Sequence, residues 1–359
     1  ELVQRDAQRR LRRVTAVTVT ALLGLLAVTA LSVVAIRARH EAEQRRRAAE
    51  GLVEFMQTDL RERLKAVNRL DVLTAANRRA LAYYAEQDLA DLPPDALARR
   101  ARILHAMGED DLDRKDYVTA ASDFAEARRT TATLLARAPA DPEMLYAHAQ
   151  SEYWVGDLAF QRKDFAAAEA GFRGYAALAE RLHAAAPGQV RSLQEIGYAT
   201  GNLCTIRQKQ ERVAGLLDLC LKSLHAMERV AALDPSSRQS QIDVANRHAW
   251  IADAYRNLLH NLPAARRHRD AESAILQRLL RAEPNDAKLE RKRIWSERAI
   301  AALEREMGAI DAGTVRLERA IGDLAKLVAQ DPANRSLAQT LDEMKDELRT
   351  TRIGNGEGR

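Results

Sequence analysis

The apolar positions of this chain recur at helical spacing in blocks that stop at regularly placed prolines. Apolar runs such as LLARAP at 134–139 and LLRAEP at 279–284 end on a proline, and polar residues follow each stop. The five prolines are Pro139, Pro187, Pro235, Pro284 and Pro332, spaced 48, 48, 49 and 48 residues apart. Proline ends a helix because it lacks an N–H and disfavours helix in the preceding residue. A fixed period of this length predicts a solenoid whose helical units bury their apolar faces against their neighbours.

The same period relates individual residues inside the first two units. Residues 107–127 and 155–175 share a pattern of small, aromatic and turn residues. The matched pairs are Gly108 and Gly156, Asp116 and Asp164, Tyr117 and Phe165, Ala120 and Ala168, and Phe124 and Phe172. We expect the glycine of each first helix to lie opposite a small alanine of the second, and RKDY and RKDF to form the turn. Each of these residues has a packing explanation, so none is interpreted as catalytic.

This pattern resembles the tetratricopeptide repeat (TPR). Family positions are occupied by Trp154, Gly156, Ala168, Phe172 and Pro187 in the second unit, and by Gly108, Ala120, Phe124, Ala127 and Pro139 in the first. The resemblance spans residues 99–335 and weakens in later units, where Cys204 and then Ala252 take the glycine's place. It implies an all-α, right-handed superhelical, TPR-like solenoid of about five long helical hairpins. Because the family's repeat has about 34 residues, we assign the extra residues of each unit to longer helices.

Residues 14–36 form an uncharged apolar run between two arginine-rich segments. The run is 23 residues long, which is about the length that crosses a hydrocarbon core of roughly 30 Å. A cleaved signal peptide would have a shorter apolar region followed by a small-residue cleavage site, and a buried helix would not be apolar on all sides. The run therefore predicts a transmembrane helix and a single-pass protein of the bacterial inner (plasma) membrane. Arginines are equally numerous on both sides, so they do not orient the helix; an upstream cytoplasmic domain would place the repeats in the periplasm.

The predicted domain map follows from these patterns. Residues 1–13 are a basic juxtamembrane segment, 14–36 the transmembrane helix, and 37–98 a helical stalk with capping helices. Residues 99–350 are the TPR-like repeat domain, with units ending near 139, 187, 235, 284 and 332, and residues 351–359 are a disordered tail. We expect the amphipathic stripe of the capping segment to cover the first repeat; the alternative is that it forms a homodimer interface. This layout resembles the C-terminal half of bacterial multidomain signalling proteins with a Toll/interleukin-receptor-type, Ser/Thr kinase or cyclase domain at the N-terminus, and we hypothesise such a domain upstream.

The charge of the chain argues against nucleic acid as a partner. Of the net charge of +5, residues 1–13 contribute +3 and residues 37–50 contribute +2, so the remainder is neutral. A nucleic-acid-binding repeat domain normally has a basic face. No phosphate-binding loop, dinucleotide fingerprint, zinc-protease or nucleophile-elbow motif is present in the sequence. We expect no enzyme, no catalytic residue, no cofactor and no metal site in this chain.

The two cysteines lie sixteen residues apart. With the glycine opposite an alanine, the hairpin register puts Cys204 and Cys220 about one helical turn out of alignment. A disulfide needs Cα atoms within about 7 Å. We therefore expect two buried free cysteines, with a disulfide as the alternative.

The resemblance places a partner-binding groove on the first helix of each unit. Transferring the register by Gly108, Gly156 and Cys204 nominates His105, Glu109, Tyr153, Asp157, Phe160, Tyr198, Thr205, Asn246 and Asp253. Aromatic side chains beside carboxylates suit a peptide or a partner helix, although Tyr153 and Phe160 are equally consistent with core positions. The predicted function is a membrane-anchored scaffold or sensor module that binds a protein partner. The alternative is a self-association module, a homo-oligomer that clusters an N-terminal effector domain.

Overall fold

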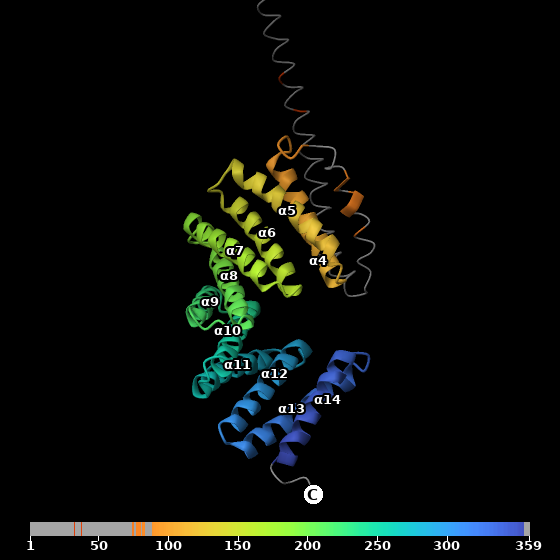
Figure 1. Cartoon of the computed structure of the whole chain (residues 1–359), viewed down its shortest axis with the longest axis vertical. Helices are drawn as coiled ribbons and strands as arrows, with labels where there is room; N and C mark the ends of the chain where they lie inside the picture. Colours follow the sequence, from red (N-terminus) through yellow and green to blue (C-terminus); the bar gives the residue numbers. More distant parts are fainter. Residues whose placement is uncertain are drawn as a thin grey trace, which may run out of the picture. The chain divides into compact units, whose positions relative to one another are not determined.

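The computed structural model describes residues 88–354, together with Ser32, Arg37, Thr74, Asn77, Arg78, Arg79, Leu81 and Ala82. The chain divides into two compact units, Glu1–Ala82 and Tyr83–Arg359, and the account below concerns the second. The described part of this unit consists of helices joined by short turns (Figure 1). The predicted basic segment 1–13, the predicted transmembrane helix 14–36 apart from Ser32, and most of the predicted stalk 37–98 lie outside the described residues.

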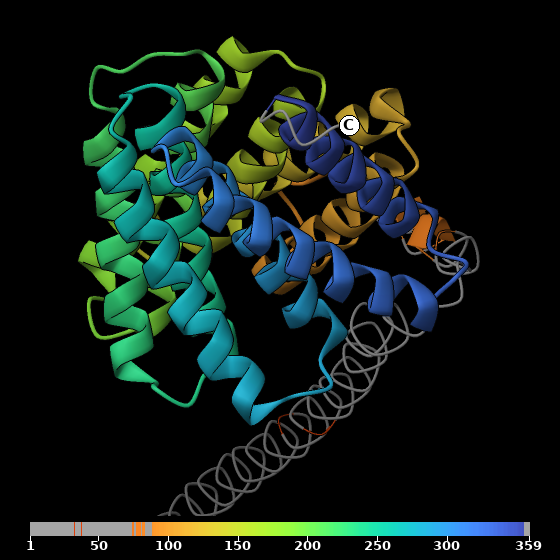
Figure 2. The same cartoon turned by 90° about the horizontal axis from the view of Figure 1, so that it is seen from below.

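Five antiparallel hairpins follow one another along the second unit, and a final helix packs on the last of them (Figure 1; Figure 2). The first helices of the hairpins are α4 Pro94–Asp113, α6 Pro142–Gln161, α8 Val190–Lys209, α10 Arg238–Asn257 and α12 Ala287–Glu306. The second helices are α5 Tyr117–Arg137, α7 Phe165–Ala185, α9 Leu216–Leu233, α11 Leu262–Ala282 and α13 Ile310–Gln330, and the final helix is α14 Arg335–Gly354. The prediction of an all-α, TPR-like helical repeat solenoid is confirmed. Helices of 18 to 21 residues account for the long period.

Every hairpin turn has a residue in the left-handed region of backbone space at an equivalent position. These residues are Lys115, Lys163, Glu211, His260 and Gly308, and their spacing of 48, 48, 49 and 48 residues repeats that of the prolines; the third turn has Gly215 as a second such residue. The residue that follows in the first two turns is an N-cap: the side chain of Asp116 accepts from the backbone N–H of Thr119, and that of Asp164 from Ala167. These caps satisfy amide groups that the start of a helix leaves unpaired. The RKDY and RKDF sequences therefore form turns for a local reason.

In the first two hairpins the register is set by an aromatic ring that covers a glycine. A Cβ on Gly108 would lie 2.5 Å from the ring of Phe124, and a Cβ on Gly156 would lie 2.8 Å from that of Phe172. Both rings are buried. In each pair the two residues are sixteen positions apart. The expected partner of these glycines was an alanine earlier in the second helix, so the predicted register was wrong by about one turn.

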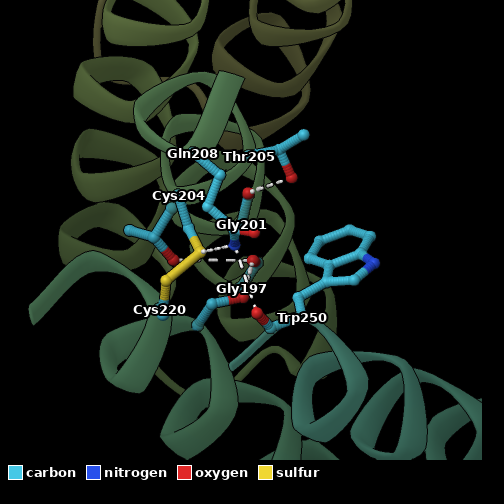
Figure 3. Close-up of a disulfide and its surroundings, with 9 residues drawn as sticks. Gly197, Gly201, Cys204, Thr205, Gln208, Cys220 and Trp250 are labelled. Carbon is cyan, nitrogen blue, oxygen red and sulfur yellow. Dashed lines mark hydrogen bonds between the residues drawn. A yellow bond between two sulfur atoms is a disulfide. The ribbon is translucent and has the colours of Figure 1, made fainter. Parts of the chain in front are cut away.

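This register also explains why the prediction of free cysteines was wrong. Cys204 and Cys220 are separated by the same sixteen residues as the glycine–phenylalanine pairs, and they occupy the equivalent positions on α8 and α9. Their Cα atoms are 5.1 Å apart, and the two sulfur atoms form a disulfide (Figure 3). In the third hairpin the disulfide therefore takes the place of the glycine–phenylalanine contact of the first two hairpins.

The predicted location in a bacterial inner membrane is contradicted. Among the helices of residues 88–354, none combines the length and the apolar composition that a bilayer crossing requires. The reason is that charged side chains are spread along these helices; α12, for example, carries Lys288, Arg291 and Lys292 within two turns. Placing such side chains in hydrocarbon costs about 2.5–3.5 kcal/mol each at the centre of a bilayer. We therefore withdraw the membrane location and the periplasmic placement of the repeats.

The end of the helical repeat also differs from the predicted map. Helix α14 continues to Gly354, past residue 350, where we expected a disordered tail to begin. Leu337, Leu341 and Met344 hold this helix against α13, because they are buried in the same apolar cluster as Leu317 and Leu324. Residues 355–359 lie outside the described residues. The other predicted domain limits stay predictions.

Candidate functional site

The first helices of the hairpins share a surface that is hollowed by several cavities. This surface consists of the side chains of α4, α6, α8, α10 and α12 that line those cavities. We call it the first-helix face. A cavity of about 810 Å³ lies between α10 and α12, and one of about 650 Å³ lies between the ends of α8 and α10. A third of about 390 Å³ lies between α6, α8 and α10, and a fourth of about 330 Å³ lies at α4 and α6. We call these the α10–α12, α8–α10, tyrosine and α4–α6 cavities.

The cavities join one another through shared side chains. Tyr146 and Gln150 line both the α4–α6 cavity and the tyrosine cavity. Trp250 lines both the tyrosine cavity and the α10–α12 cavity. Asp253 in turn lines the α10–α12 and the α8–α10 cavities. The hollowed surface is therefore continuous from the first hairpin to the fifth.

Four of the predicted groove residues line the cavities between α8, α10 and α12. Thr205 and Asp253 line the α8–α10 cavity, and Asn246 lies on the wall of the α10–α12 cavity. Asp253 is paired with Arg269 at 2.5 Å, and Asn246 accepts a hydrogen bond from Lys292 at 3.1 Å. Tyr198 lines the tyrosine cavity and donates its hydroxyl to Asp243 at 2.9 Å. These residues are brought together, although their functional role stays a prediction.

The other predicted groove residues serve packing to a larger extent. Tyr153 lines the tyrosine cavity, but its ring also packs against Trp154, Phe172 and Tyr175. Phe160 packs against Phe165 at the edge of the core. Glu109, Asp157 and Phe160 line none of the four cavities described above. Burial raises the pKa of Asp157. Burial also raises the pKa of the Tyr153 hydroxyl, and the negative charges of Asp157 and Glu109 raise it further.

The α10–α12 cavity combines exposed aromatic rings with cations that lack a counter-charge. Trp295 is 39% exposed, which is unusual for so large a ring. Arg291, one turn before it, is exposed and makes no hydrogen bond or ion pair within the described residues. Within the part of the chain that the structure describes, the only hydrogen-bond partner of Lys292 is the neutral side chain of Asn246. Arg298, one turn after Trp295, is paired with Glu347 of α14 at 2.8 Å.

Sequence reasoning missed the most distinctive side chains of the face. Arg247, Trp250, Arg291, Lys292 and Trp295 were not nominated. Helical spacing could have identified some of them. Trp250 lies four residues after Asn246 and three before Asp253, so it shares a helix face with these two nominated residues. Arg291, Trp295 and Arg298 repeat this spacing on α12. Only the burial of Arg247 could not have been anticipated in this way.

His105, the first predicted groove residue, lies between two hairpins, and we expect it to make the protein sensitive to acid. Its Nε2 lies 2.8 Å from the hydroxyl of Ser151, and burial lowers its pKa from 6.5 to about 4. Folding therefore favours the neutral imidazole of His105. The stability that this group contributes is fully present above pH 6.5 and is lost progressively as the pH falls toward 4. Between pH 7 and pH 5 the free energy of unfolding should fall by about 2 kcal/mol on account of this group.

Urea denaturation at the two pH values, on the wild type and on His105→Gln, checks this expectation. The variant should lose less stability than the wild type between pH 7 and pH 5. It should not become insensitive to acid, because burial and the neighbouring His268 also lower the pKa of His248 to about 4. Equal losses in the two proteins would show that His105 is not held neutral by burial.

Comparison with known proteins shows the fold but no family. No family model matches the chain, and no curated protein matches it. Among solved structures it is similar to BtubC (BKLC) from P. vanneervenii, with 14% identity over 75% of this chain and 92% of that one and a TM-score of 0.50. It is also similar to a thermophilic TPR protein of Thermus thermophilus, with 17% identity over 68% and 98% of the two chains and a TM-score of 0.37. A TPR repeats protein from Bacteroides fragilis matches with 12% identity over 69% and 98% and a TM-score of 0.25.

The fold places this protein among the TPR-like helical repeat structures. The likeness to solved structures concerns the fold alone, because the sequence identities are low.

Proposed function

We propose that the repeat domain binds a segment of a protein partner along the first-helix face. One observation carries this proposal: the four cavities adjoin one another through shared side chains, and the α4–α6, tyrosine and α10–α12 cavities are lined by tyrosine or tryptophan rings together with charged side chains. An extended or helical peptide needs such a continuous surface, with pockets for side chains along it. Aromatic and arginine side chains supply much of the binding energy in protein interfaces.

The charge around Trp295 favours a partner segment with acidic residues near this end of the face. Arg291 and Lys292 have no carboxylate partner within the described residues, so an acidic segment would gain their charge without breaking an ion pair. Complementary charge mainly speeds association and sets the register of the bound segment. The aromatic surface of Trp295 and Trp250 would then supply the affinity.

Site-specific photo-crosslinking tests the proposal. A photoreactive amino acid at position 295 should form an adduct with one partner in cells that make this protein, because Trp295 stands on the proposed surface. The adduct should disappear when Arg291 and Lys292 are both changed to Glu. Val118 on α5 is 83% exposed and is the matched control position. No adduct at position 295, or the same adduct from position 118, would contradict the proposal.

Self-association is the alternative role of the same domain, and the crosslinking experiment separates the two. An adduct of the chain with a second copy of itself would favour a homo-oligomer, and light scattering on the purified protein would then show a mass above 40.0 kDa. A role within a bacterial signalling protein is a further part of the proposal. It is supported only by the resemblance in domain order, and the identity of the crosslinked partner would test it.

A further inference from the structure

Arg247 on α10 is a buried cation that forms no ion pair within the described residues. Its side chain lies in the wall of the tyrosine cavity, and the residue is only 5% exposed. Its Nε and Nη1 atoms are buried and have no hydrogen-bond partner, and within the described residues the side chain makes no ion pair. An arginine keeps its charge in proteins, and a buried charge without a partner is costly. Folding alone does not explain why arginine stands at this position.

The neighbouring aromatic rings compensate this charge only in part. The guanidinium lies over the ring of Trp250, 4.1 Å from its centroid, and 5.8 Å from that of Tyr198. Burial lowers the pKa of Arg247 to about 10, and the charge of Asp243 opposes this shift. Asp243 is not a hydrogen-bond partner of Arg247, because its oxygens accept from the hydroxyl of Tyr198 and from Gln239.

The packing beneath Arg247 holds the guanidinium in place. A Cβ on Gly201 of α8 would lie 2.5 Å from Nη1 and 2.9 Å from Cζ of Arg247, so the guanidinium packs closely against this glycine. Figure 3 shows Gly201 between the disulfide and the ring of Trp250. Gln208 donates to the backbone oxygen of Trp250 at 3.2 Å, which fixes α10 against α8. The cation is therefore positioned in advance.

The tyrosine cavity offers a second donor without a hydrogen-bond partner. Nδ2 of Asn202 is buried and has no hydrogen-bond partner within the described residues, and Asn202 lines the same cavity as Arg247. Glu195 is the other charged group on the wall. Its carboxylate accepts from the hydroxyl of Tyr175 at 2.5 Å and from Gln150 at 2.9 Å, and burial raises its pKa. Arg247 and Asn202 thus keep unpaired donors, while the carboxylate of Glu195 is already hydrogen-bonded.

We propose that the tyrosine cavity binds the side-chain carboxylate of an aspartate or glutamate within the partner segment, with Arg247 and Asn202 as its donors. This inference rests on the proposed function and names the chemistry of one residue of the partner. A side chain fits better than a chain end, because the first-helix face continues on both sides of the cavity through Tyr146 and Trp250. The bound carboxylate supplies the counter-charge that Arg247 lacks in the free protein.

A random peptide library tests this assignment when each peptide is displayed between two folded domains, so that neither chain end is free. Peptides selected by the wild-type protein should share one acidic position. Changing that residue to its amide, Asp→Asn or Glu→Gln, should weaken binding about 10- to 100-fold, as expected for a hydrogen bond to a charged group. In Arg247→Met the same change in the peptide should have little effect. Arg267→Met is the matched control, because Arg267 is an exposed cation on α11 that lines none of the four cavities, and it should leave the dependence on the acidic residue intact.

The stability of the free variant gives a second readout. Arg247→Met removes a buried charge that has no partner, so it should unfold at the same temperature as the wild type or at a higher one. Weaker peptide binding with unchanged or raised stability therefore supports a binding role. Selected peptides without a shared acidic residue, but whose binding is lost in Trp295→Ala, would overturn the carboxylate subsite and leave the proposed function standing. Selection of peptides that bind equally well to Trp295→Ala would overturn both, and a requirement for a free C-terminal carboxylate would overturn the side-chain assignment.

Discussion

Replacing Gly171 with alanine is expected to lower the free energy of unfolding by about 2 kcal/mol, although alanine is the better helix former. A Cβ on Gly171 of α7 would lie 2.7 Å from Cα and 2.9 Å from the backbone nitrogen of Gly156 on α6. Backbone atoms cannot move aside as the end of a side chain can, so the two helices must separate. Overpacking costs about 1–3 kcal/mol, and a clash with backbone atoms belongs at the upper end of this range. Subtracting the roughly 1 kcal/mol that alanine gains over glycine inside a helix leaves the net loss of about 2 kcal/mol.

Gly322 on α13 is the matched control for this substitution. It also lies inside a second helix, but a Cβ there would meet nothing within 4 Å. Gly322→Ala should therefore raise the free energy of unfolding by about 0.5–1 kcal/mol. Urea denaturation followed by circular dichroism measures both variants. If Gly171→Ala were as stabilising as Gly322→Ala, then α6 and α7 would not approach each other as closely as the structure shows.

Reduction of the Cys204–Cys220 disulfide is expected to have the second large effect, a loss of about 3 kcal/mol. The bond closes a loop between residues sixteen positions apart, and a loop of about that length restricts the unfolded chain by roughly 3 kcal/mol. The loss should appear as a lower urea midpoint when a phosphine reductant is present. The double variant Cys204→Ala/Cys220→Ala should start from the lower stability and should not respond to the reductant. A wild-type protein that also failed to respond would mean that the two thiols are not joined.

Much of the fold could be predicted because its determinants are local in sequence. The prolines and the residues around each turn act within a few positions of themselves, so a regular spacing was enough to predict hairpins of equal length. The register between the two helices of a hairpin was harder to predict. Gly108 and Gly156 lie against Phe124 and Phe172, and the same spacing of sixteen residues would have paired Cys204 with Cys220. The prediction failed because a small residue was assumed to face another small one.

The candidate site could be predicted less well than the fold. The register of the first helices nominated Tyr198, Asn246 and Asp253, which line cavity walls in the structure, because the positions that share one face of a helix follow from its periodicity. Arg247 follows Asn246 directly in sequence and would normally be taken for a solvated cation. Its surroundings are Gly201 and Tyr198 of α8 and Trp250 of α10. A property that arises from two separate helices has no signature in one of them.

Hydrogen–deuterium exchange on the complex tests the central claim, that the first helices form the binding surface. The measurement compares the free protein with the protein bound to the partner captured at position 295. We predict slower exchange on binding in α6, α8, α10 and α12, strongest around Tyr198, Arg247 and Trp295, with little change in α5, α7 and α11. Protection confined to the second helices, or none within residues 88–354, would contradict the account.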